Sequence, residues 1–327
     1  MDRRAFLKQS AQSAAVLAAG ATWAEGGAGN MPVQPSSSNA SAVPQRPYGN
    51  TTDQLSVVGF GGIAVANTEQ KDADRLVAEA VERGVNYFDV APTYGDAEER
   101  LGPALEPYRD RVFLACKTTE RQRGPAEVEF RRSLERLRTD HFDLYQVHGI
   151  ADVVRDVEPA FGKGGVMELL IEAKKQGRVR YLGFSAHSAE AALAAMDRYA
   201  FDSVLFPINF AAYYKGRFGA EVIERAQRQG TARLALKAMA RQKWPESDPQ
   251  RRQYAKCWYQ PLTDPVEAEL GLRWTLSQPV TAAIAPGEAS LFRMALDIAS
   301  RFSPVTPEET AKLKALAETL DPVFIPA

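Results

Sequence analysis

The stretch NYFDVAPTYG, residues 86–95, places an aspartate at the end of a short apolar run. Five residues after Asp89, Tyr94 stands in a loop flanked by proline and glycine. A lone carboxylate at the end of a buried strand is costly unless a charged or hydrogen-bonding partner faces it. Asp89 therefore predicts a partner elsewhere in the chain, and the fold has to bring that partner to the end of this strand.

Apolar runs of this kind alternate with helical patterns along most of the chain. Those typical of strands occupy residues 56–62, 85–91, 111–118, 142–148, 179–185, 202–208, 232–239 and 280–286. Between them, apolar residues recur about every 3.6 residues, as in the helices expected from Asp72 and Pro265. This alternation favours an α/β fold, a closed (β/α)8 TIM barrel with parallel strands, over an open doubly wound sheet. A Thr-x-x-Glu capping pattern at Thr306 predicts an extra C-terminal helix.

The composition excludes several functional classes. The 327 residues include 40 basic and 41 acidic side chains, a balance that gives no electrostatic attraction to nucleic acid or to an anionic membrane surface. With two cysteines, Cys116 and Cys257, and 3 histidines, the chain gives poor support to a metal centre, and we expect none. Apart from its first residues, the chain has the composition of an ordinary soluble globular protein.

The first residues differ from the rest. The opening MDRRAFLKQS carries Arg3 and Arg4 before an uncharged, alanine-rich run that ends near Ala24. The pattern resembles a twin-arginine export signal over residues 1–24, with Asp2 where serine or threonine is often found. It implies the twin-arginine export machinery as a partner and a periplasmic location. A soluble amphipathic helix with a chance arginine pair is the alternative interpretation.

Two domain boundaries follow from the same region. The uncharged run is too short and too weakly apolar to cross a bilayer, so no stable membrane span is expected. Residues 25–45 are rich in glycine, proline and serine and are expected to form a flexible linker. The barrel is accordingly expected over residues 46–327.

Four polar residues fall where a parallel barrel gathers its catalytic groups, at and after the carboxyl ends of consecutive strands. They are Asp89, Tyr94, Lys117 and His148. Neighbouring strands lie about 4.8 Å apart, so side chains at equal height can meet. Because side chains alternate along a strand, an inward Lys117 places Cys116 outward under a helix.

Three of the four residues have an ordinary structural explanation as well as a catalytic one. Asp89 and Lys117 alone can form a structural ion pair, and a lone strand-end histidine is more often a core residue than a catalyst. As a set, the four residues indicate catalysis more specifically than any one of them does. A phenol with a pKa near 10 becomes a useful acid when a nearby ammonium stabilises its phenolate. Lys117 supplies that ammonium, Asp89 holds it charged, and a histidine can position a carbonyl oxygen. The set predicts general-acid catalysis by Tyr94.

The same residues lie in stretches that resemble aldo-keto reductases. In chain order these are RPYGNTTDQLSVVGFGG, a short hairpin leading into the first strand, GVNYFDVAPTYGDAEERLG, VFLACKT, SLERLRTDHFDLYQVH and GFSAHS. The resemblance runs from Arg46 to about Leu320. It implies a (β/α) barrel and an oxidoreductase that transfers hydride reversibly between NADP(H) or NAD(H) and a small aldehyde, ketone or alcohol. It also implies Tyr94 as the general acid, tuned by Lys117 and Asp89, and His148 as the carbonyl-orienting group.

The resemblance further implies a cofactor site. Its positions in this chain are Gly62, Ser185, Lys237, Gly287 and Arg293. An arginine that binds the 2′-phosphate of NADP(H) is often found at the last of these. Lys237 can equally be a solvated lysine at the barrel rim.

The cofactor region departs from the family pattern at several positions. Ala186 and Leu205 replace the asparagine and glutamine that usually help to hold the nicotinamide carboxamide. Glu288 stands where serine or lysine is expected, and Asp297 replaces an asparagine. A carboxylate here opposes a 2′-phosphate unless it faces away, so the choice between NADP(H) and NAD(H) stays open.

Two other functions stay open on the sequence. A non-catalytic barrel that binds a nucleotide or another ligand is favoured by the altered carboxamide contacts and disfavoured by the complete set of four residues. A non-redox isomerase or lyase can use Tyr94 and Lys117 as acid and base, and the fold alone does not exclude it. Two loops, residues 211–218 and 242–261, carry aromatic residues that either line the substrate pocket or pack the loop: Tyr213, Tyr214, Trp258 and Tyr259.

Overall fold

The computed structural model describes residues 42–325. The predicted export signal and most of the predicted linker lie outside the described residues. The packed chain begins slightly before the expected boundary at residue 46, because Val43 is buried and its N–H donates to the Arg83 carbonyl at 2.9 Å. The strands β1 (Gln45–Pro47) and β2 (Gln54–Ser56) then pair antiparallel, which confirms the predicted hairpin.

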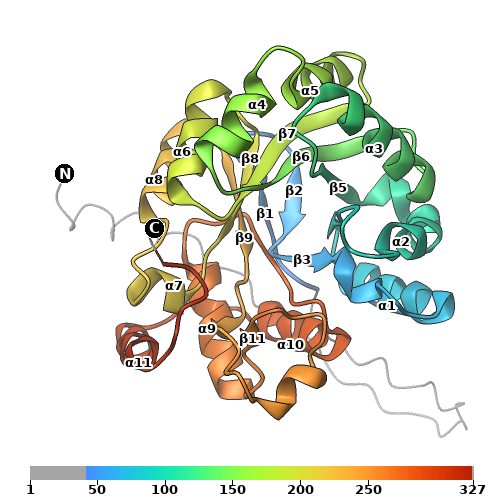
Figure 1. Ribbon diagram of the computed structural model, residues 1–327. Coiled ribbons are helices and arrows are strands. Elements are labelled where there is room, and N and C mark those ends of the chain that lie inside the picture. Colours follow the sequence, from blue (N-terminus) through green and yellow to red (C-terminus); the bar gives the residue numbers. More distant parts are fainter. Residues whose placement is uncertain (1–41, 326–327) are drawn as a thin grey trace, which may run out of the picture. The chain divides into compact units, whose positions relative to one another are not determined.

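Within residues 42–325, eight parallel strands close into a barrel in the order β12-β3-β4-β5-β6-β7-β8-β9 (Figure 1). Their bounds are β3 (Val58–Gly61), β4 (Tyr87–Asp89), β5 (Phe113–Thr118), β6 (Phe142–Ile150), β7 (Val179–Ala186), β8 (Ser203–Pro207), β9 (Ala232–Leu236) and β12 (Ala282–Ile284). Each predicted apolar run overlaps one of these strands, although β6 and β7 extend past the predicted ends at residues 148 and 185, so the (β/α)8 TIM barrel is confirmed. Buried Tyr48 packs on the rings of Phe113 and Tyr181, with centroids 5.1 Å away in both cases. The hairpin thereby covers the amino-terminal end of the barrel.

Helices cover the outside of the barrel (Figure 1). The longer ones are α1 (Gln70–Glu82), α2 (Ala97–Leu105), α3 (Arg123–Arg136), α5 (Val166–Lys175), α6 (Ala189–Arg198), α8 (Ala220–Gln229), α9 (Pro265–Ser277) and α10 (Ala289–Ser300). Shorter pieces are η2 (Gly62–Val65), η3 (Glu106–Arg111), η4 (Val153–Val157), α4 (Glu158–Phe161), α7 (Phe210–Tyr214) and η5 (Pro249–Arg252). The predicted C-terminal helix is α11 (Pro307–Glu318), and Thr306 and Glu309 form the predicted capping box. Of the helices described, none has both the length and the apolar character needed to cross a membrane.

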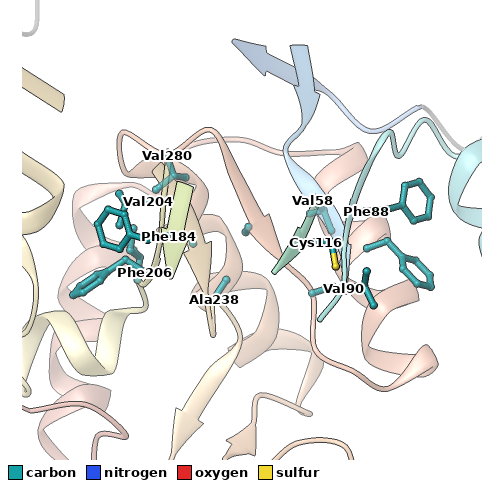
Figure 2. Packing of buried hydrophobic residues seen from close by; sticks show 14 of the residues in the cluster. Val58, Phe88, Val90, Cys116, Phe184, Val204, Phe206, Ala238 and Val280 are labelled. Carbon is teal, nitrogen blue, oxygen red and sulfur yellow. The ribbon is translucent and has the colours of Figure 1, made fainter. Parts of the chain in front are cut away.

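Alternation along the strands divides the buried side chains into two sets. One set packs against the helices, and Figure 2 shows several of its members, including Phe88 and Cys116. The other fills the barrel interior and includes Leu144 and Leu205. Full burial of such large apolar side chains stabilises the fold by roughly 1.5–3 kcal/mol each. The outward position of Cys116 is as predicted, and the same alternation turns Lys117 toward the barrel interior.

The long polar stretch between β9 and α9 is a folded excursion. The strand β10 (Ala240–Gln242) pairs antiparallel with β11 (Gln260–Pro261), and the Trp244 indole N–H donates to the Cys257 carbonyl at 2.8 Å. The excursion reaches the start of the barrel, where the Lys256 ammonium donates to the Ala64 carbonyl of η2 at 2.7 Å. These strands have 3 and 2 residues, too few for a sequence periodicity to reveal them.

Candidate active site

Asp89 and Lys117 form a buried ion pair at the carboxyl ends of β4 and β5. The Lys117 ammonium donates to Asp89 Oδ1 and, at 3.1 Å, to the Val90 carbonyl. Lys117 is 0% exposed and Asp89 is 2% exposed, so water solvates neither charge. Burial is the largest single effect and lowers the pKa of Lys117, but the charge and hydrogen bond of Asp89 together with Tyr94 and Cys116 raise it by more, so the net shift is upward. Asp89 thus has the partner that its position in the sequence requires.

Two further residues hold Asp89 and were not predicted. Gln146 on β6 donates from Nε2 to Asp89 Oδ2 at 3.1 Å, and the Tyr87 hydroxyl donates to the same oxygen at 3.2 Å. Both are fully buried. Tyr87 lies two positions before Asp89 and Gln146 two positions before His148, so both share the inward face of their strands. That shared parity is the sequence signal that could have identified them.

Tyr94 stands in the loop between β4 and α2, beside the ion pair. Its ring centroid lies 5.6 Å from Lys117 Nζ and 6.2 Å from the His148 ring, which meets it edge-on at 84°. Burial raises the pKa of the Tyr94 phenol, Lys117 lowers it, and the Asp89 carboxylate raises it again, so that the net shift is upward. The acid-strengthening effect expected of Lys117 is therefore present but smaller than the effect of burial. The phenol carries its proton at neutral pH.

His148 ends the inward-facing row on β6 and is held by Ser185 of β7. Its Nδ1 lies 3.0 Å from Ser185 Oγ, and the Gly149 N–H donates to that hydroxyl at 2.7 Å. The hydroxyl accepts from Gly149 and keeps its own proton and one lone pair, so it can donate to Nδ1 or accept from it, depending on the imidazole tautomer. Burial, and then the charge of Lys117, lower the pKa of His148 to about 2. The imidazole of His148 is therefore neutral at neutral pH.

Lys237 follows β9 and faces the mouth of the barrel, the end at which Asp89, Lys117 and His148 also lie. Its backbone has a φ of 57°, in the left-handed region that non-glycine residues rarely adopt. Its ammonium lies 5.4 Å from the Trp258 ring centroid and 5.7 Å from that of Tyr259. Burial, and then Lys117, lower its pKa to about 8. Within residues 42–325 no carboxylate pairs with it, so the mouth holds an ammonium that an anionic group can neutralise.

The four aromatic residues of the two loops divide between packing and the site. Trp258 and Tyr259 enclose the Lys237 ammonium. Tyr213 and Tyr214 instead pack on a buried tryptophan of α9, Trp274, with ring centroids 5.3 and 5.5 Å away. The loop at residues 242–261 therefore contributes to the mouth, and the aromatic pair of the other loop anchors α7.

Gly62 and Gly287 lie where segments approach closely. A Cβ on Gly62 would lie 2.8 Å from the Val90 side chain and 3.2 Å from the Asp89 carbonyl, and a Cβ on Gly287 would lie 2.7 Å from the Ile63 side chain. Both glycines are thus needed for the packing of η2 beside the mouth. Ala186 and Leu205 are buried in apolar clusters. Ser185 is therefore the polar side chain that remains of the three carboxamide contacts implied by the resemblance.

Arg293 lies on α10 at some remove from this set, paired with Glu79 of α1 at 2.7 Å. Asp297, on the same helix, pairs with Arg83 at 2.7 Å.

In the described part of the chain no three His, Cys, Asp or Glu side chains are grouped to hold a metal ion, and both cysteines are buried free thiols. The donors at the mouth, an unpaired ammonium and neutral hydroxyl and imidazole groups, fit the phosphates and carboxamide of a nicotinamide dinucleotide.

Comparison with known proteins identifies the family. Residues 57–256 match the model of the family described as the aldo/keto reductase family. In Bacillus subtilis, the uncharacterized oxidoreductase YqkF is 33% identical over 158 residues, 43% of this chain and 48% of the relative, and the aldo-keto reductase YhdN is 34% identical over 152 residues, 42% and 43% of the two chains. The matched region thus spans about half the length of these relatives. The holo form of an aldo-keto reductase from Bacillus halodurans shares the fold, with a TM-score of 0.66 and 24% identity over 85% of this chain and 98% of the other. The chain belongs to the aldo/keto reductase family.

Proposed function

We propose that this chain catalyses reversible hydride transfer between a nicotinamide cofactor, NADP(H) or NAD(H), and a small aldehyde, ketone or alcohol. The observation that carries the proposal is the convergence of Tyr94, Lys117, Asp89 and His148 at the carboxyl end of the barrel. A structural ion pair needs neither a protonated phenol nor a neutral imidazole beside it.

The cofactor, when bound, supplies or accepts the hydride. Tyr94 donates its phenolic proton to the carbonyl oxygen as negative charge develops there, and Lys117 stabilises the phenolate that remains. Asp89 keeps the ammonium charged and in place. His148 donates from Nε2 to the same carbonyl oxygen and orients it, because its pKa of about 2 keeps the ring neutral. In the oxidative direction the Tyr94 phenolate accepts the proton of the alcohol.

Two polar contacts with the cofactor are proposed at the mouth, beside two glycines that border it. The Lys237 ammonium, which lies beside the rings of Trp258 and Tyr259, contacts the cofactor diphosphate. The half-buried position of this side chain and its lowered pKa argue against a fully solvated lysine at the rim. The Ser185 hydroxyl keeps one lone pair after its contacts with His148 and Gly149, and this lone pair accepts from the carboxamide NH2. Gly62 and Gly287 border the path of the cofactor and keep it free of side chains.

The same contacts support the two alternative functions, an isomerase or lyase and a ligand-binding barrel, less well. An isomerase or lyase that uses Lys117 as its base needs a neutral amine, whereas the pKa of Lys117 is raised and the ammonium persists at neutral pH. A barrel that only binds a ligand gains nothing from a protonated phenol beside a neutral histidine.

Transfer of deuterium from cofactor to product tests the proposal. Full-length protein is incubated with NADH or NADPH that carries deuterium at both C4 positions and with a panel of small aldehydes, and mass spectrometry follows the products. We expect one deuterium on the new carbinol carbon. An isomerase would give product without the label, and a binding barrel would give no product, so either result would contradict hydride transfer.

We also propose that the chain is exported through the twin-arginine machinery to the periplasm, on the support of Arg3, Arg4 and the uncharged run after them. That machinery carries folded proteins, so a tightly held cofactor can travel with the chain. Replacing both arginines with lysine is expected to retain the protein in the cytoplasmic fraction. Equal periplasmic amounts of wild type and variant on immunoblots of cell fractions would argue against this route.

A further inference from the structure

Arg293 is already paired with a carboxylate. Its Nε lies 2.9 Å from both carboxylate oxygens of Glu79, and its second guanidinium nitrogen lies 2.7 Å from Oε2. Their side chains are 49% and 30% exposed, so the pair is partly solvated but bidentate. The contact uses one edge of the guanidinium and offsets its charge. A 2′-phosphate would have to compete with Glu79 for this arginine.

Glu288 brings an additional carboxylate to the same region. It directly precedes α10 but does not cap the helix; instead its Oε1 accepts from the Lys256 backbone N–H at 2.9 Å. The Lys256 ammonium is turned to the Ala64 carbonyl, 2.7 Å away. Among residues 42–325, no ion pair neutralises Glu288, and its Oε2 accepts no hydrogen bond. This oxygen is available to a ligand.

A cavity of about 540 Å³ brings these groups together. It is bounded by η2, one face of α1, Lys256 and the first turn of α10. Its charged side chains are Asp72, Arg75, Glu79, Lys256, Glu288 and Arg293. The first two pair with each other, and Glu79 pairs with Arg293. Both guanidiniums of the cavity thus already face carboxylates in partly exposed pairs, whereas Glu288 has no counter-ion, a set that favours a hydroxyl donor over a 2′-phosphate.

We propose that this cavity binds the adenosine ribose of NAD(H) and disfavours the 2′-phosphate of NADP(H), with Glu288 as the specificity-determining residue. The inference rests on the proposed hydride transfer, which requires a dinucleotide. A carboxylate accepts hydrogen bonds from the ribose hydroxyls of NAD(H), and an acidic residue plays this part in other dinucleotide sites. A 2′-phosphate at the same place would set like charges against each other in a partly solvated cavity. Arg293, the cation that could offset this repulsion, is already paired with Glu79.

Fluorescence titration of the full-length chain with NADH and with NADPH tests the inference. We expect NADH to bind at least about tenfold more tightly, since like charges a few ångströms apart near a protein surface cost that much or more. Competition with 5′-AMP and with 2′,5′-ADP isolates the adenosine half of the ligand. The fragment without the 2′-phosphate is expected to compete better.

Three charge-neutralising variants locate the effect. Glu288→Ser should remove most of the difference in affinity, because it weakens the binding of NADH and strengthens the binding of NADPH. Glu79→Gln should tighten NADPH alone, because it leaves Arg293 without its counter-ion. Glu82→Gln, the exposed last residue of α1 and no part of the cavity, is the matched control and should leave both affinities unchanged. Thermal denaturation of each variant establishes that it is folded.

The outcomes separate this inference from the proposed function. If wild-type protein binds NADPH as tightly as NADH, or if Glu288→Ser leaves their ratio unaltered, the specificity assignment is overturned and hydride transfer stands. If neither nucleotide binds, the proposed hydride transfer fails, and the inference fails with it.

Discussion

Replacing Tyr94 with phenylalanine is expected to lower the kcat of carbonyl reduction by about 10²–10⁴-fold, the usual contribution of a positioned general acid. Phenylalanine keeps the ring that lies 5.6 Å from Lys117 Nζ and 6.2 Å from the His148 ring, but it has no proton to donate. Since the hydroxyl acts on the carbonyl oxygen rather than on the cofactor, the dinucleotide Kd should be nearly unchanged. Steady-state kinetics and a fluorescence titration on the same preparation measure the two quantities.

Tyr87→Phe is the matched control for this prediction. It also deletes a phenolic hydroxyl from the site, but one that donates to Asp89 Oδ2 at 3.2 Å inside the barrel. Loss of one hydrogen bond costs about 0.5–1.5 kcal/mol, so kcat should fall by no more than about tenfold. If Tyr94→Phe has an effect as small as this, the proton reaches the carbonyl from another donor, and His148 is the remaining candidate.

The barrel and its four converging residues were predictable because they depend on periodicity along the chain. Alternation alone sets Lys117 inward and Cys116 outward, and the observed contacts follow it. The shared end of parallel strands brings Asp89 and His148 to one mouth. Gln146 obeys the same alternation, but its hydrogen bond to Asp89 joins residues 57 positions apart and depends on side-chain directions that no pattern reveals.

Contacts between helices that are distant in the sequence could not be predicted from it for a related reason. Glu79 and Arg293 are 214 positions apart. Which of several charged residues on α1 meets Arg293 depends on how α1 and α10 pack around the barrel, and periodicity does not specify that. The sequence therefore suggested an arginine available to a phosphate, whereas the fold supplies it with a carboxylate.

Replacing Lys117 with methionine is expected to lower the free energy of unfolding by about 3–5 kcal/mol, because it leaves a buried carboxylate, Asp89, without its counter-ion. The kcat should fall as well, since no ammonium would stabilise the Tyr94 phenolate. The pKa of Lys117 is raised above its ordinary value of 10.5. Its stabilising contribution is therefore fully present below that value and is lost only as the pH rises through the higher folded-state pKa. The stability deficit of the variant should persist throughout the neutral range.

The double variant Lys117→Met, Asp89→Asn separates the structural part of this loss from the catalytic part. The asparagine carries no charge, yet its side-chain oxygen can still accept from Gln146 as the carboxylate does. Most of the lost stability should return in urea denaturation, because no uncompensated charge remains buried. Turnover should stay low, because the ammonium beside the phenol is still missing. A single variant as stable as wild type would show that the carboxylate is not held as an ion, and a double variant with wild-type turnover would remove Lys117 from the mechanism.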